Sequence, residues 1–84
     1  MTARDGVKVL TTDAKGFRGT AWHVEIDGKH YVISAISNEF ATETMAFVAD
    51  ERGQVEDYAE LVVVRTWDHE ACIAALLNTL GAAS

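Results

Sequence analysis

The sequence predicts an α+β domain: an antiparallel β-meander of four or five strands with one C-terminal helix packed on one face. The first observation is two alternating runs around Asp27-Gly28, which predict a hairpin because a type I′ turn needs φ > 0 at both central residues. The second is a series of short β-branched runs separated by turn residues, typical of locally connected strands. The third is a C-terminal leucine stripe at helical spacing. At 84 residues we expect a single domain, residues 1–84.

The strands follow one another along the chain. We expect a first strand over residues 7–12 and hairpin strands over 17–26 and 29–37. The hairpin register pairs residue 26 with residue 29 and continues outward. One face then carries apolar side chains, namely Trp22, Val24, Ile26, Tyr31 and Ile33. The other face carries His23, Glu25, His30, Val32, Ser34 and Ile36.

The second half of the chain continues the meander and ends in a helix. A strand over residues 43–49 leads to a turn in which Gly53 takes positive φ. The last strand is centred on 61–64, with a start near Val55 and a bulge at Glu56-Asp57 as its longer form.

The helix is expected over residues 67–80, with Thr66 as N-cap and Gly81 as C′ residue. Its apolar stripe should cover the Trp22 face of the sheet, and consists of Ile73, Leu76, Leu77 and Leu80.

One helix is not enough to cover this sheet. The run 61–64 is apolar on both sides, which is typical of strands buried on both faces. A helix about 10–12 Å across covers about two strands at 4.8 Å spacing. We therefore expect another cover over Val32, Ile36, Val62 and Val64 or their neighbours: the N-terminal segment, a second copy of the chain, or a target protein. The alternative is an ordinary exposed face of β-branched residues.

The composition excludes some partners. A net charge of −6 argues against binding nucleic-acid phosphates or an anionic membrane. It fits simple solubility or mimicry of a nucleic acid. The single cysteine, Cys72, excludes an intrachain disulfide and indicates a reducing compartment. With no apolar stretch of membrane length and no apolar leader segment, we expect a cytoplasmic protein.

Two groups of polar residues could bind a metal. His23, Glu25 and His30 share a face and could hold zinc, but their spacing is generic, and the favoured interpretation is a solvated patch with a Glu–His ion pair. Acidic residues crowd one turn without the alternating ligand pattern of a calcium loop, so we expect a solvated acidic surface made of Asp50, Glu51, Glu56, Asp57 and Glu60. We therefore expect no metal or cofactor site.

Three further residues have simple interpretations. His69 is expected to pack at the edge of the helix stripe, and Cys72 to act as a small buried hydrophobe rather than a nucleophile. Phe40 lies in a loop, where it could be a contact anchor or could pack over the open end of the core. No phosphate loop or hydrolase motif is present, and we expect no enzymatic activity.

The C-terminal half resembles small proteins of actinobacterial phages. The similarity lies in the strand–turn–strand of residues 43–55, which reads E-T-M-A-F-V-A-D-E-R-G-Q-V, and in the acidic start of the helix that follows. The resemblance implies a phage or prophage accessory protein that acts in the host cytoplasm by binding, and inhibiting, a host protein.

The sequence therefore predicts a protein-binding function, with a host protein as partner and a homodimer through the second sheet face as a further option. An alternative is an acidic nucleic-acid mimic that blocks a host defence protein, of the anti-CRISPR or anti-restriction type. The residues expected to contact the partner are His23, Glu25, His30, Val32, Asp50, Glu51, Glu56 and Asp57.

Overall fold

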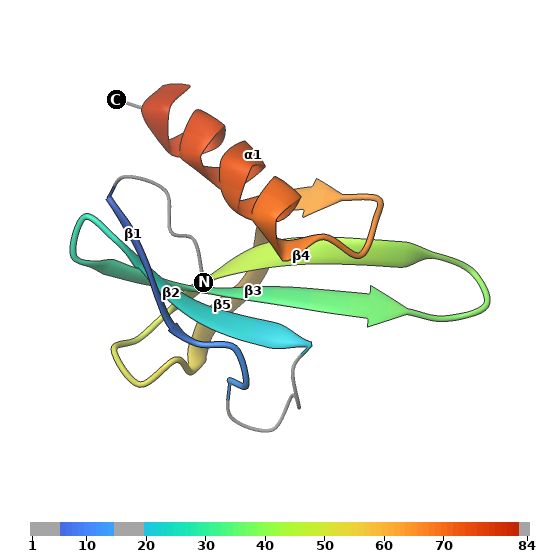
Figure 1. Cartoon of the computed structure of the whole chain (residues 1–84), viewed down its shortest axis with the longest axis horizontal. Helices are drawn as coiled ribbons and strands as arrows, with labels where there is room; N and C mark the ends of the chain where they lie inside the picture. The colour runs from blue at the N-terminus through green and yellow to red at the C-terminus, as the bar shows by residue number, and fades with distance from the viewer. Residues whose placement is uncertain (1–5, 15–19, 83–84) are drawn as a thin grey trace.

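The computed structural model describes residues 6–14 and 20–82, which form one antiparallel sheet and one helix (Figure 1). The sheet has the order β1-β2-β3-β4-β5, so every strand pairs with its neighbour in sequence. This confirms the predicted α+β meander with a C-terminal helix. The elements are β1 (Val7–Thr11), β2 (Ala21–Ile26), β3 (Lys29–Ser37), β4 (Thr42–Ala49), β5 (Val55–Val64) and α1 (His69–Ala82).

The β2–β3 hairpin has the predicted register. Asp27 and Gly28 adopt φ of 51° and 80°, as a type I′ turn requires. Ile26 pairs with Lys29, and the pairing continues to Trp22 opposite Ile33. The side chains therefore divide between the two faces as the sequence predicts. The part of the predicted strand over residues 17–19 lies outside the described residues.

The first face of the sheet forms the main core under α1. The helix packs on three strands, β3, β4 and β5. This is one more than the two strands expected from the diameter of a helix. The buried residues of this cluster are Val7, Val24, Ile26, Tyr31, Ile33, Ala46, Cys72, Ile73 and Leu76. Val62 and Val64 pack against the same cluster, so the helix accounts for two of the valines in the last strand.

Strand β5 bends strongly. Ala46 pairs with Val62 and Val48 with Asp57, so between these two pairs β5 advances by more residues than β4. A second irregularity follows before Ala49 pairs with Val55. These bulges increase the local twist. In Figure 1, β5 crosses behind the sheet and ends beside α1.

The second face is covered in part by the chain itself. A smaller core cluster joins Ala14, Ala21, Val32 and Ala49, with Val55 of the bent strand packed against it. Val32 is therefore covered by residues of its own chain, and neither a second copy nor a target protein is needed to bury it. The cover comes from the segment after β1 and from the start of β5.

The helix begins two residues later than predicted. Asp68, not Thr66, is the N-cap: its Oδ1 accepts the Ala71 N–H at 3.0 Å. At the other end the helix runs through Gly81 to Ala82, so the prediction of Gly81 as C′ residue is wrong. The predicted first strand and the 43–49 strand each differ from the structure by one residue at one end.

Thr44 of β4 fixes the segment that leads into α1. Its hydroxyl donates to the Thr66 carbonyl at 2.6 Å and accepts the Asp68 N–H at 3.0 Å. The side chain is fully buried. One hydroxyl thus satisfies two backbone groups of the segment between β5 and α1.

We expect Thr44→Val to destabilise the domain by about 1–3 kcal/mol, because at nearly unchanged volume it removes two hydrogen bonds, each worth about 0.5–1.5 kcal/mol. Urea unfolding followed by circular dichroism measures the loss. Thr42→Val is the matched control: its hydroxyl bonds only to exposed Ser37, and we expect a change of about 0.5 kcal/mol or less. Equal losses in both variants would contradict this role for Thr44.

Candidate functional site

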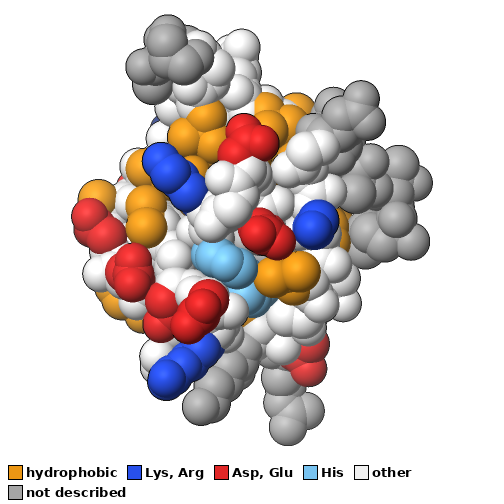
Figure 2. All heavy atoms as spheres, turned by 90° about the vertical axis from the view of Figure 1, so that its left-hand side faces the viewer, with side chains coloured by type: hydrophobic (Ala, Val, Ile, Leu, Met, Phe, Trp, Pro, Cys, Tyr) orange, Lys and Arg blue, Asp and Glu red, His pale blue; other side chains and the backbone are white. Residues whose placement is uncertain are grey.

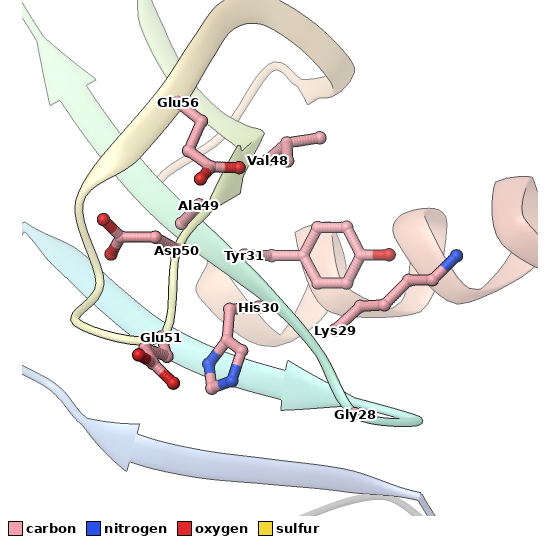
Figure 3. Close-up of a pocket in the computed structure, with 9 residues that line it drawn as sticks. All are labelled: Gly28, Lys29, His30, Tyr31, Val48, Ala49, Asp50, Glu51 and Glu56. Carbon is pink, nitrogen blue, oxygen red and sulfur yellow. The ribbon is translucent and has the colours of Figure 1, made fainter.

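An open hollow lies at the end of the sheet where the β2–β3 and β4–β5 turns meet. Its volume is about 570 Å³. The residues that line it are Gly28, Lys29, His30, Tyr31, Val48, Ala49, Asp50, Glu51 and Glu56, and Figure 3 shows how they surround it. Seen from this end, histidine side chains occupy the middle of the surface and acidic side chains lie around them (Figure 2).

Asp50 builds the β4–β5 turn on one side of the hollow. Its Oδ1 accepts the N–H of Arg52 at 2.8 Å and of Gln54 at 3.0 Å. Two backbone bonds, Asp50 N–H to Gln54 and Gly53 N–H to Asp50, close the same turn. The Gln54 N–H is the largest cause that lowers the pKa of Asp50, followed among the lowering causes by that of Arg52. Asp50 is thus an ionised structural residue of the turn.

A pair of histidines on β2 and β3 lies beside the hollow. His23 of β2 and His30 of β3 are joined by a hydrogen bond of 2.8 Å between Nε2 of His23 and Nδ1 of His30. The ring centroids lie 5.0 Å apart. The sequence placed Glu25 opposite His30, and the register confirms that position. The diagonal neighbour His23, however, is the hydrogen-bond partner of His30.

The β4–β5 turn rests on His23. Gly53 has φ of 81°, and a Cβ added there would lie 2.8 Å from Nδ1 of His23. Burial lowers the pKa of His23 below its ordinary 6.5, and the charge of His30 lowers it further, while Asp50 and Glu25 oppose both. His23 therefore favours its neutral form in the folded protein.

The predicted contact residues divide into three groups. His30, Asp50, Glu51 and Glu56 come together around the hollow. His23 and Val32 are only 5% and 1% exposed, so neither side chain is accessible in this structure, and a contact role for them stays a prediction. The bent β5 and its preceding turn cover them, which strand periodicity alone does not reveal.

The other two predicted residues lie apart from the hollow's lining. Glu25 is half-buried on β2. Asp57 is exposed and its Oδ1 accepts the Ala59 N–H at 2.9 Å, so it supports the bulge of β5. Among residues 6–14 and 20–82, no three His, Cys, Asp or Glu side chains are grouped so that they could hold a metal ion.

A second candidate surface lies at the opposite end, on the tip of the β3–β4 hairpin, which extends beyond the rest of the sheet (Figure 1). Phe40 at this tip is 88% exposed. It does not pack over the core, which removes one of its two interpretations. Asn38 orders the tip, since its Oδ1 accepts the N–H of Phe40 at 2.8 Å and of Ala41 at 3.0 Å.

Two more apolar side chains lie toward this end on the second face. Ile36 near the end of β3 and Val63 near the end of β5 are 42% and 41% exposed. They lie on either side of β4, because Ile36 pairs with Glu43 and Val63 with Met45. We call Phe40, Ile36 and Val63 the tip surface.

His69 and Cys72 have structural positions. His69 stacks on Trp22 with centroids 4.6 Å apart, and its Nε2 donates to the Thr20 carbonyl at 3.0 Å. It thereby fixes the start of α1 to β2, consistent with the predicted packing role. Cys72 is buried in the main core, and burial raises the pKa of its thiol to about 11.

Comparisons of the chain with protein-family models, with curated proteins and with solved structures give no match. In the part of the chain that the structure describes, no helix has the length and apolar character needed to cross a membrane.

We expect Gly53→Ala to destabilise the domain more than Gly28→Ala. Both glycines have φ near +80°, but a Cβ at Gly28 meets nothing within 4 Å whereas one at Gly53 meets the His23 ring. Each variant carries backbone strain of about 1–3 kcal/mol, and only Gly53→Ala must also displace the turn. Thermal unfolding measures the difference, and equal losses would show that the turn does not rest on His23.

We expect the Cys72 thiol to be unreactive in the folded protein. Its raised pKa leaves little thiolate, so Ellman's reagent at pH 8 should react more than about a hundredfold more slowly than with a free cysteine. In denaturant the rate should return to that of the free amino acid. Fast reaction without denaturant would contradict the burial of this side chain.

Proposed function

We propose that this chain is a protein-binding domain that docks through its tip surface, and that it acts on a host protein as a phage-type accessory protein. The single observation that supports docking is Phe40, 88% exposed on an ordered hairpin tip. Aromatic side chains are enriched among residues that dominate binding energy. The resemblance of residues 43–55 to actinobacterial phage proteins supports the choice of partner class.

The tip is suited to binding because little of its order has to be created on association. The two Asn38 bonds fix the backbone on which Phe40 stands, and the Asn38 N–H also donates to the Ala41 carbonyl at 2.9 Å. The Ser37 and Thr42 hydroxyls bond at 2.8 Å across the base of the loop. A preorganised loop loses less entropy when it binds. Phe40 is therefore expected to enter an apolar pocket of the partner.

We expect Phe40→Ala to weaken the complex by about 2 kcal/mol or more, roughly thirtyfold in Kd, as for a central aromatic anchor. The measurement is capture from an actinobacterial lysate on immobilised protein, with quantitative mass spectrometry and then a Kd for the captured partner. Leu10→Ala is the matched control, since Leu10 is a half-exposed apolar residue on β1. A partner retained equally by both variants would refute docking through the tip.

The hollow supports a second candidate function, an acidic mimic of nucleic acid. Glu51, Glu56 and Asp50 all line it, and acidic side chains gather at this end of the molecule (Figure 2). Such a surface would bind the basic groove of a defence protein. The Lys29 side chain in the lining offsets part of this charge, which is why the tip surface is the first choice.

Salt separates the two candidates. Docking through Phe40 should change little between about 0.05 and 0.5 M NaCl, whereas binding by the acidic end should fall steeply as the Debye length shortens. Replacing both Glu51 and Glu56 with Gln should leave the first complex intact and weaken the second. Strong salt dependence together with loss in the double variant would select the mimic and reject the tip.

A further inference from the structure

The His23–His30 pair is a buried titratable feature that lies beneath a turn and between two strands. A hydrogen bond between Nε2 of His23 and Nδ1 of His30, 2.8 Å long, needs an N–H on one nitrogen and a lone pair on the other. It exists when at least one imidazole is neutral. When both rings are protonated, two N–H groups and two positive charges face each other, and the bond is lost.

The turn over the pair depends on the position of the His23 ring. Gly53 approaches that ring so closely that even a Cβ would not fit, with 2.8 Å to Nδ1. The turn is closed by Asp50, and Val55 just beyond it packs over Ala49 and Val32. A movement of His23 therefore has to move the turn, and the turn is continuous with the lining of the hollow.

The charged groups around the pair come from every element packed against it. On β2 there is Glu25, which lies opposite both Lys8 of β1 and His30 of β3. On the β4–β5 turn there are Asp50, which raises the pKa of His23, and Glu51, which lines the hollow beside His30. Burial and His30 outweigh the acidic groups, because the pKa of His23 is lowered on balance.

The direction of the pH effect follows from that balance. A histidine whose pKa is lowered by folding stabilises the folded form fully above the unfolded value of about 6.5. This contribution is lost as the pH falls from about 6.5 toward the lowered pKa, because the unfolded or opened form binds the proton more tightly. Mild acid therefore favours any arrangement that lets water reach His23.

We propose that the His23–His30 pair is a pH-sensitive clasp, which holds the β4–β5 turn against the sheet at neutral pH and releases it when both imidazoles are protonated. Release frees residues 50–55 from the second face while α1 and the main core stay in place. The hollow then changes shape, since Asp50 and Glu51 on one side move relative to His30. The surface at this end of the molecule is thus different in mildly acidic solution.

The test is NMR on the intact chain between pH 8 and 4.5. Imidazole ¹⁵N shifts report each histidine, and amide hydrogen exchange, corrected for its intrinsic pH dependence, reports opening. We expect the pKa of His23 in the closed form to lie below 6.5. The Gly53 and Gln54 amides should lose protection as the pH falls from about 6.5 toward that pKa and then level off. The protection factor should fall about tenfold for every pH unit that separates the pKa of His23 in the opened form from its pKa in the closed form. Amides of Ile33 and Ile73 should keep their protection.

A variant separates the clasp from general acid sensitivity. In His30→Asn the side-chain amide oxygen takes the place of Nδ1 and accepts a hydrogen bond from the Nε2–H of His23. Because asparagine carries no charge, this bond survives when His23 is protonated, and the turn should stay protected at pH 5. The proposal is overturned if the turn opens equally in His30→Asn, if it does not open in the wild type, or if all amides lose protection together.

Discussion

The structure depends on one constraint: a single sheet with apolar side chains on both faces has to be covered twice by a chain of 84 residues. The helix covers one face, where Ile73 and Leu76 meet Val24 and Ile33 in the main core. The bend in β5 supplies the second cover, since it brings Val55 over Val32 and Ala49. A straight β5 would remove Val55 from Val32 and Ala49 and expose part of that cluster, at a cost of about 25 cal/mol for each Å² of apolar surface.

The same bend determines where polar groups gather. It carries the β4–β5 turn back over β2 and β3, which places Asp50 near His23 and forms one side of the hollow. The opposite end of the sheet has no such cover, and Phe40 stands free there on its hairpin. The two ends of the molecule therefore differ: one groups acidic side chains around histidine, and the other presents the exposed ring of Phe40 on an ordered hairpin tip.

Much of this fold could be predicted from the sequence, because it is determined locally. The Asp27-Gly28 turn sets the register of β2 and β3, and the leucine stripe sets the face of α1. The N-cap at Asp68 was missed because a tertiary contact from Thr44 fixes the residues before it. The packing of Gly53 on His23 could not be predicted for a similar reason. The two residues are far apart in sequence, and they meet only because the bulges in the β4–β5 pairing bend the turn over β2. The sequence predicts the acidic turn that forms one side of the hollow. It does not predict the burial of His23 and Val32, which depends on the bend in β5.

The chain covers its own second face, and this can be measured directly. The most direct measurement is an isotope-filtered NOESY experiment on a mixture of labelled and unlabelled protein, which separates contacts within a chain from contacts between chains. We expect intramolecular cross-peaks from Val55 to Val32 and from Gly53 to the His23 ring. Intermolecular cross-peaks to Val32, with the intramolecular ones absent, would show that a second copy covers this face and would contradict the account.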